Sequence, residues 1–210
     1  NAWIKKMYFI FWPLTSLMFI ILFSRIFKCK NSSLKGNENI LIDIFITSEN
    51  LSTDRYYNKL EKKKLNNKKN IYFVPTILNV SILKLPKLIK QIRNNKNFIL
   101  KEDFINFSDI VYAFNYIFRK KKFYINYTNY KNWNLSNLIW EEFSRYPNFQ
   151  AILISILNYR FAKNLRGKNI KLKKVIDWFE NTTVDKGWNF GFRKFFPKTI
   201  TLGYQSYTLY

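Results

Sequence analysis

The chain has 210 residues, a length that suits one domain together with a membrane helix or the start of a second domain. Its 36 basic and 13 acidic residues give a formal charge of +23, which invites a nucleic-acid or anionic-membrane partner. Because histidine is absent and Cys29 is the sole cysteine, this sequence excludes a Ser-His-Asp or Cys-His centre, histidine-ligated zinc and an intramolecular disulfide.

The first predicted element is a hydrophobic helix. Met7 to Ser24 carries no charge, and the apolar run extends to Phe27, about the 20 residues that a membrane-spanning helix needs. Aromatic residues that suit a membrane interface lie toward one end of it: Trp3, Tyr8 and Trp12. Basic residues are slightly more frequent after the run than before it, which favours a cytoplasmic location for the rest of the chain. We expect residues 7–27 to contact a membrane; the alternative is a buried helix of a domain that lies upstream.

Strands and amphipathic helices alternate after a polar linker. Four apolar runs have the length of buried strands: Ile40–Thr47, Ile71–Val74, Lys173–Phe179 and Thr199–Gly203. Pro75 is expected to end the second of these strands. Helices are predicted at Ser52–Leu65, after Ser81, after Ser108, on both sides of Pro147, and from Val184 up to Pro197. This alternation predicts an α/β fold, with a largely parallel, Rossmann-like sheet covered by helices on both faces.

Each predicted helix has an apolar face. The helix after Ser81 is expected to bury Leu85, Leu88, Ile89 and Ile92, and the helix after Pro147 is expected to end near Gly167. In the last helix the core residues are predicted to be Val184, Trp188, Phe192 and Phe195. Gly187 and Gly191 lie four residues apart there, and we interpret them as permitting close packing on the sheet.

The chain divides into three parts on this interpretation. Residues 1–30 form the hydrophobic helix, residues 31–39 the linker and residues 40–210 the α/β domain. Because the first residue is Asn1 and the last predicted strand has nothing after it to cover it, we expect the sequence to be a fragment, truncated at the C-terminus.

Polar residues collect at the carboxyl edge of the last two predicted strands. Glu180 and Asn181 directly follow one strand, and Tyr204 and Gln205 follow the next. Ligands of open parallel sheets bind beyond the carboxyl ends of the strands, so these side chains are candidates for a shared site. Glu180 is the candidate catalytic residue, and the other three are candidate substrate-binding residues.

The helix between these strands adds to the same edge. Thr182 and Asp185 have the spacing of a capping box, and a helix N-terminus favours a bound anion. Lys186 in the first turn and Arg193 two turns later complete the candidate substrate-binding set. A structural explanation competes for every residue: Glu180 could complement the helix dipole, the capping residues could only cap, and the cations could be solvated.

Other motifs are absent or weak. The five glycines form neither GxG nor GxxxxGK, and no two aspartates are separated by one residue, so no cofactor and no metal are expected. Glu141 and Glu142 are adjacent and therefore point about 100° apart on a helix, which excludes a catalytic pair. Glu142 lies on the apolar side, either at a rim or in a cleft with a raised pKa.

At the candidate site the sequence resembles a family of bacterial surface-carbohydrate (O-antigen or capsule) biosynthesis proteins with a glycosyltransferase-like, two-lobed architecture. The resemblance rests on WFENTTVDKGWNFGFRKFFP, from Trp178 to Pro197, and TITLGYQ, from Thr199 to Gln205. It covers less than a fifth of the chain, and upstream of it only the order of elements agrees. The resemblance implies that Glu180 and Gln205 belong to the cleft and that a second lobe beyond Tyr210 holds the nucleotide diphosphate.

The function expected from this resemblance is metal-independent transfer of a sugar from a nucleotide-sugar donor to a lipid-linked or saccharide acceptor. The place would be the cytoplasmic face of the bacterial inner membrane. A non-catalytic, membrane-anchored assembly protein with the same fold is the alternative, and a module that binds anionic lipid or nucleic acid is a third.

The positive charge has a compositional explanation that bears on this third alternative. Lys, Asn, Ile, Phe and Tyr are all abundant and all have A/T-rich codons, so genomic base bias would raise the lysine content without selection for binding. The lysines fall in solvated stretches such as 61–69 and 119–122, without the interleaved aromatics of a nucleic-acid surface. We therefore expect no nucleic-acid partner.

Overall fold

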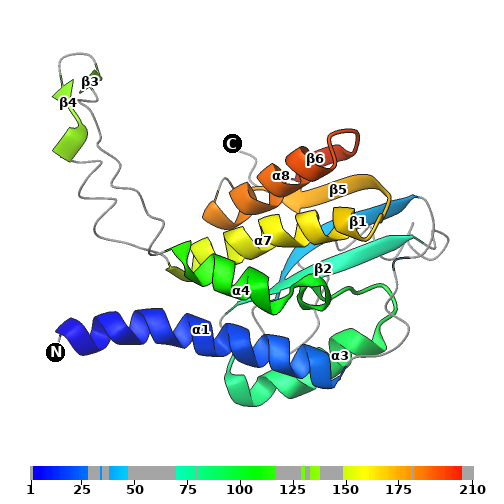
Figure 1. The fold of residues 1–210 in the computed structure, drawn as a ribbon, viewed down its shortest axis with the longest axis horizontal. Coiled ribbons are helices and arrows are strands. Elements are labelled where there is room, and N and C mark those ends of the chain that lie inside the picture. Colours follow the sequence, from blue (N-terminus) through cyan, green and yellow to red (C-terminus); the bar gives the residue numbers. More distant parts are fainter. Residues whose placement is uncertain are drawn as a thin grey trace, which may run out of the picture.

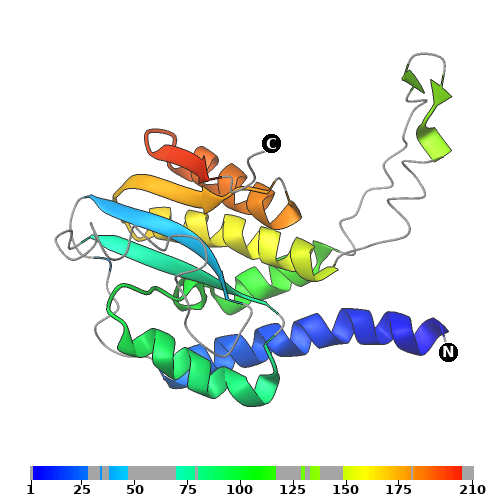
Figure 2. The same ribbon diagram turned by 180° about the vertical axis from the view of Figure 1, so that it is seen from behind.

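The computed structural model describes residues 2–27, 34, 38–46, 70–78, 80–116, 129–130, 133–137, 149–180 and 182–204. Its centre is a four-stranded sheet in the order β2-β1-β5-β6, formed by β1 (Asn39–Ile46), β2 (Ile71–Ile77), β5 (Leu172–Trp178) and β6 (Ile200–Tyr204). All three strand pairs are parallel, and helices lie on both faces of the sheet (Figures 1 and 2). The predicted α/β fold with a parallel sheet is confirmed. Two short antiparallel strands, β3 (Asn129–Tyr130) and β4 (Trp133–Asn134), form a separate pair.

One face of the sheet is covered by α3 (Leu85–Asn94) and by the C-terminal half of α1 (Ala2–Ile26). The short 3-10 helix η1 (Ile82–Lys84) leads into α3. The four predicted apolar residues of α3 are all buried, against Ile42, Ile44 and Phe73 of the sheet: Leu85, Leu88, Ile89 and Ile92. Burial of this apolar surface is the main force that holds the helix on the sheet.

The opposite face is covered by α7 (Phe149–Gly167), α8 (Thr183–Phe195) and the 3-10 helix η2 (Lys101–Phe104). The aromatic rings of Phe161, Trp188 and Phe192 meet in the middle of this layer, packed on Leu41 and Val175 of the sheet. The helix α4 (Phe107–Phe114) packs on α7 and on α1 (Figure 1). The predicted end of α7 at Gly167 and the predicted core positions Trp188 and Phe192 are confirmed.

The two helix glycines contact a different element from the one predicted. A Cβ atom at Gly187 would lie 2.0 Å from the backbone oxygen of Ser155, and one at Gly191 would lie 2.9 Å from Cα of Tyr159. Both neighbours belong to α7. The glycines therefore allow α8 to approach α7 closely, whereas the prediction had them face the sheet.

Two predictions about element boundaries were wrong. β2 continues through Pro75 to Ile77, because β2 is an edge strand, where a missing N–H group need not break a ladder. The N-cap of α4 is Asn106, which forms a capping box with Asp109; Ser108 already lies inside the helix. Predicted helices at Ser52–Leu65 and around Glu141 and Glu142 lie outside the described residues.

The second half of the hydrophobic helix α1 is attached to the domain by side-chain packing and by a hydrogen bond. Leu14, Leu17 and Ile20 pack into the core clusters, and the guanidinium of Arg93 donates a hydrogen bond of 2.6 Å to the backbone oxygen of Ser24. The same guanidinium forms a two-pronged, buried ion pair with Asp103. Considering only residues that the structure describes, we find no helix whose length and apolar character would allow it to cross a membrane.

Candidate functional site

The order of the strands places a topological switch point between β1 and β5. From β1 the chain goes to β2 on one side of it, and it returns to β5 on the other side before adding β6. In open α/β sheets, ligands bind at the carboxyl ends of the strands that flank such a point. The carboxyl ends of β1 and β5, and of the neighbouring strands, therefore define where a site is expected.

Two buried aspartates lie next to each other inside this region. The register pairs Ile42 of β1 with Ile176 of β5, so that Asp43 and Asp177, one residue further on, are neighbours on the face covered by α7 and α8. Their side chains share a hydrogen bond, and both residues are essentially inaccessible to solvent. Asn189 of α8 donates a second hydrogen bond to the carboxylate of Asp177.

A buried lysine extends these hydrogen bonds toward β2. The Nζ atom of Lys101, on η2, donates hydrogen bonds of 2.8 Å to Oγ1 of Thr76 and of 2.8 Å to Oδ1 of Asn158. Thr76 in turn donates to Oδ1 of Asp43 across 3.3 Å. A chain of hydrogen bonds thus connects the Lys101 amine on η2, through Thr76 of β2, to the aspartates on β1 and β5. We call Asp43, Thr76, Lys101, Asn158 and Asp177 the buried polar network.

Burial dominates the proton affinities in this network. Desolvation raises the pKa of Asp43 to about 7, although the Lys101 ammonium and the Thr76 hydroxyl oppose it. Desolvation and the negative charges of Asp43 and Asp185 raise the pKa of Asp177 to about 8. Burial lowers the pKa of Lys101. Near neutral pH the two aspartates therefore hold at least one proton between them, as like charges in close contact require.

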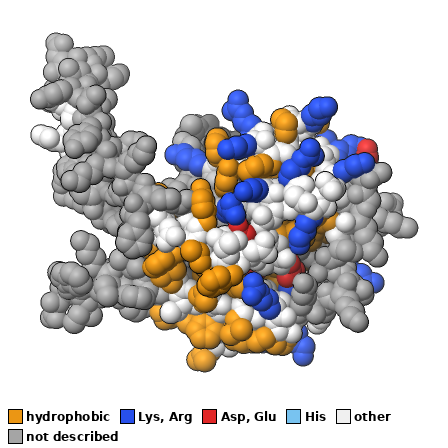
Figure 3. Space-filling view, viewed as in Figure 1, with side chains coloured by type: hydrophobic (Ala, Val, Ile, Leu, Met, Phe, Trp, Pro, Cys, Tyr) orange, Lys and Arg blue, Asp and Glu red, His pale blue; other side chains and the backbone are white. Residues whose placement is uncertain are grey.

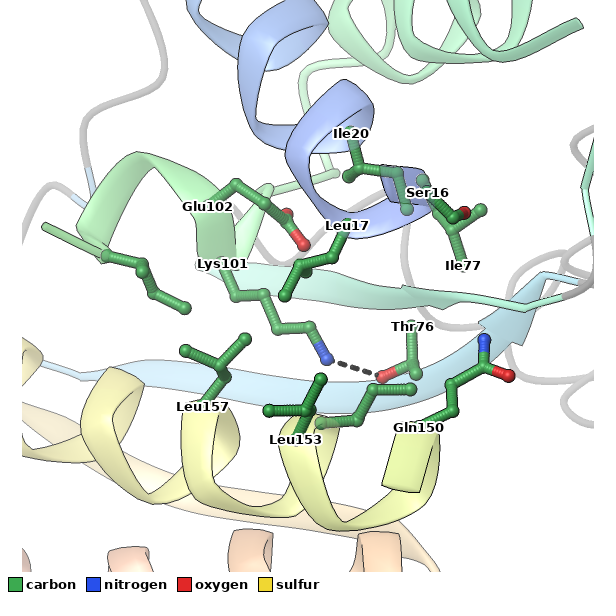
Figure 4. Close-up of a pocket in the computed structure, with 12 residues that line it drawn as sticks. Ser16, Leu17, Ile20, Thr76, Ile77, Lys101, Glu102, Gln150, Leu153 and Leu157 are labelled. Carbon is green, nitrogen blue, oxygen red and sulfur yellow. Dashed lines mark hydrogen bonds between the residues drawn. The ribbon is translucent and has the colours of Figure 1, made fainter. Parts of the chain in front are cut away.

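A small pocket opens beside the Lys101 end of the network. It lies between α1, η2, α7 and the end of β2, with the Lys101 amine and the Thr76 hydroxyl on its floor and Leu17 and Ile20 of α1 above them (Figure 4). Its volume is about 30 Å³. Since a bound water needs about 10–15 Å³, this space admits two or three waters and no sugar ring.

A different group of side chains lies at the outer edge of β5 and β6. Oε1 of Glu180 accepts a hydrogen bond of 2.6 Å from the indole Nε1 of Trp178. The Trp178 ring lies 5.4 Å from the ring of Tyr204 at the end of β6, and both Glu180 and Tyr204 are exposed. At this outer edge (Trp178, Glu180 and Tyr204) an accessible carboxylate and an accessible aromatic ring both contact the Trp178 side chain.

The first turn of α8 borders the outer edge, and a side chain of the protein already accepts hydrogen bonds from the N–H groups at this end of the helix. The predicted capping box of Thr182 and Asp185 is confirmed. Oδ2 of Asp185 accepts from the backbone N–H groups of Thr182 at 2.9 Å and Glu180 at 3.0 Å. A carboxylate of the chain itself thus takes the place that an anionic ligand could have taken at this helix end.

The structure brings together only some of the predicted site residues. Glu180 and Tyr204 share the outer edge, and Lys186 is exposed in the first turn of α8. Arg193 lies ten residues after Thr183, in the last turn of α8, about 15 Å along the helix from the edge. Asn181 and Gln205 lie outside the described residues, so the expected pairing of Gln205 with Glu180 stays a prediction.

Sequence reasoning missed the buried polar network. The available signal was a single acidic residue in an otherwise apolar strand, Asp43 in ILIDIFIT and Asp177 in VIDWF. A charge at such a position is rare unless it is paired, and this rule would have linked the two strands. Lys101 gave no comparable signal, because one more lysine in a chain with 36 basic residues does not stand out.

Among the residues with described positions, no group of three or more acidic, histidine or cysteine side chains has the arrangement of a metal site. Comparison with models of known protein families, with curated proteins and with solved structures found no match to this chain.

Proposed function

We propose that the outer edge binds a saccharide, as part of a glycosyltransferase-like protein of bacterial surface-polysaccharide biosynthesis. The observation that supports this most directly is the geometry of Glu180, whose exposed carboxylate is held by the Trp178 indole beside the exposed ring of Tyr204. This group lies at the carboxyl end of a parallel sheet, next to its switch point, where ligands of such sheets bind.

The chemistry of the outer edge suits a neutral sugar. A carboxylate accepts hydrogen bonds from sugar hydroxyls, and the face of an aromatic ring packs against the C–H groups of a pyranose. A diphosphate fits less well, because Asp185 already fills the start of α8. We therefore assign the sugar, or the saccharide acceptor, to this edge, and do not assign the diphosphate of a nucleotide-sugar to it.

Glu180 is our candidate for the group that orients, or deprotonates, the attacking hydroxyl. Its hydrogen bond to Trp178 fixes one oxygen and leaves the second to face a ligand. Asp43 and Asp177, whose pKa values are raised to about 7 and about 8, are sealed in the interior and cannot touch a substrate in this conformation.

Saccharide binding and turnover by the chain test the proposal. Saturation-transfer NMR with monosaccharides and nucleotide-sugars should show contact, and Glu180→Gln and Tyr204→Ala should each weaken binding roughly tenfold, the loss of one charge-assisted hydrogen bond or one stacked ring. Glu38→Gln and Tyr112→Ala are matched controls, since Glu38 is also exposed and Tyr112 is 40% exposed against 45% for Tyr204. Unchanged binding by both test variants would remove the outer edge from the proposal.

A second candidate is a non-catalytic assembly protein that keeps the sugar-binding edge. It is favoured by the burial of Asp43 and Asp177, because carboxyl groups that a substrate cannot reach cannot act on it. The two functions differ in turnover. A lipid-linked acceptor and a nucleotide-sugar, given to the protein together, should yield product if the protein is a transferase. Saccharide binding that Glu180→Gln weakens, without any product, would indicate the assembly protein.

A further inference from the structure

One face of α1 is apolar and uncovered. The large hydrophobic side chains that are exposed on this helix share a single stripe: Trp12, Met18, Phe19, Leu22 and Ile26. At about 100° per residue they fall within an arc of about 120°. The opposite arc, with Leu14, Leu17, Ile20 and Ile21, packs on the domain. We call the exposed set the α1 stripe.

The surroundings of the α1 stripe are basic. Arg25 is exposed at the edge of the stripe, and α3, which packs beside α1, carries Lys87 and Lys90 on its exposed side. In the space-filling view, hydrophobic side chains gather along the lower part of the molecule, over α1 and its neighbours, with basic side chains close to them (Figure 3). An apolar stripe bordered by cations is the surface chemistry of a helix that lies in the interface of an anionic membrane.

We propose that the α1 stripe docks the domain on the surface of an anionic lipid bilayer, with α1 lying in the plane of the membrane. An in-plane position follows from the packing. The inner face of α1 is fixed to the core, and Arg93 bonds the Ser24 carbonyl, so lipid can reach only the outer face of this half of the helix. Trp12, with an amphipathic ring, lies at one end of the stripe, and Arg25 lies near the other.

Charge distinguishes lipid from the other possible occupant, a second copy of the chain. Two copies that met through the α1 stripe would bring together chains of formal charge +23 and place their basic margins side by side. An anionic membrane reverses the sign of this interaction, and each basic residue close to such a surface strengthens binding about fivefold. This proposal is independent of sugar binding at the outer edge.

Sedimentation of the chain with vesicles tests the proposal. We expect binding to vesicles of phosphatidylcholine mixed with phosphatidylglycerol, and at least about tenfold weaker binding to phosphatidylcholine alone, because several cations contribute. Added salt should weaken binding to the mixed vesicles. Leu22→Glu should reduce the partition coefficient about tenfold or more, since it removes a buried leucine and adds a charge of the wrong sign.

Leu202→Glu is the matched control for Leu22→Glu. The leucine at position 202 is 44% exposed on β6, against 48% for Leu22, so the same change is made at equal exposure but on another element. This variant should bind as the unaltered chain does. Thermal melting of both variants shows whether they keep the fold.

Three outcomes would overturn the proposal. They are equal binding by Leu22→Glu and Leu202→Glu, a lack of binding to the mixed vesicles by the folded chain, and, without lipid, a concentration-dependent dimer that Leu22→Glu abolishes. An environment-sensitive dye on Leu22→Cys in a Cys29→Ser background adds a direct measurement. Its emission should shift to the blue on mixed vesicles, and the same dye on Leu202→Cys should not respond.

Discussion

Asp43 and Asp177 come from strands that are 134 residues apart in the numbering and adjacent in the sheet, and their carboxyl groups share a hydrogen bond in the interior. Each of the two has a partner that keeps it in place, Thr76 for Asp43 and Asn189 for Asp177. A pair of this kind is tolerated in a low-dielectric interior only if it retains a proton. The stability of the fold should therefore depend on the protonation of this pair.

The first prediction is a pH dependence with a definite sign. The pKa values of Asp43 and Asp177 rise from an ordinary value of 3.8 to about 7 and about 8 in the folded protein. At pH values above 3.8 and below these raised values, the folded chain holds protons that the unfolded chain has released. The free energy of unfolding should therefore fall as the pH rises from about 4 to 8, at about 1.4 kcal/mol per pH unit for each group that the folded chain still protonates, several kcal/mol in total, and level off above that range.

Urea denaturation at several pH values measures this slope. Asp177→Asn keeps an acceptor for Asn189 and removes one titrating group, so the slope between these pH values should become smaller. Glu38→Gln, at an exposed position, should leave it unchanged. A slope in Asp177→Asn equal to that of the unaltered chain would show that the pair does not control stability.

The second prediction concerns the lysine of the buried polar network. Lys101→Met removes the donor to Thr76 and Asn158 and leaves Asp43 without its nearest cation. We expect the free energy of unfolding to fall by about 2–4 kcal/mol, because buried polar groups lose their partners. Lys186→Met, at an exposed site, should change it by less than about 0.5 kcal/mol in the same chemical denaturation experiment.

The third prediction concerns the attachment of α1. Arg93→Leu removes both the ion pair to Asp103 and the hydrogen bond to the Ser24 carbonyl. The loss of a buried ion-pair partner should destabilise the fold by about 3–5 kcal/mol. Hydrogen exchange should also become faster along α1, whereas the amides of β5 should keep their relative protection. Equal acceleration in both elements would mean that Arg93 stabilises the fold as a whole and has no special role for α1.

The fourth prediction compares two glycines. Gly187→Ala places a methyl group 2.0 Å from the Ser155 backbone oxygen, so α7 and α8 must move apart. We expect a loss of about 3 kcal/mol or more, at the upper end for overpacking. At Gly167 an added Cβ has no atom within 4 Å, so Gly167→Ala should be neutral or slightly stabilising. Thermal melting of the two variants provides the comparison, and similar melting temperatures would contradict the close approach of the helices.

Local patterns in the sequence predicted much of the fold. The apolar runs predicted the four strands of the main sheet, the period of Leu85, Leu88, Ile89 and Ile92 predicted a buried helix face, and Thr182 and Asp185 predicted a capping box. These features depend on residues within a few positions of each other. Hydrophobic periodicity and capping chemistry are therefore sufficient to identify them.

The site was predictable only in part, because it also depends on contacts between residues that are far apart in the sequence. Glu180 and Tyr204 were placed at one edge because the sequence put both directly after predicted strands, and they lie just beyond the end of β5 and at the end of β6. Arg193 was grouped with them, but the rise of a helix carries it about 15 Å away. The environment of Glu142 and the position of Gln205 stay predictions, since both residues lie outside the described parts of the chain.

The sequence by itself determined which segments become strands and helices and which faces they bury, because these properties depend on neighbours along the chain. Only the tertiary structure decided that Asp43 meets Asp177, that Lys101 reaches Thr76 and Asn158, and that the glycines of α8 face α7. Strand order, register and helix contact join residues that are far apart in sequence. The proton affinities of the buried groups follow from that arrangement, because desolvation and neighbouring charges act through space.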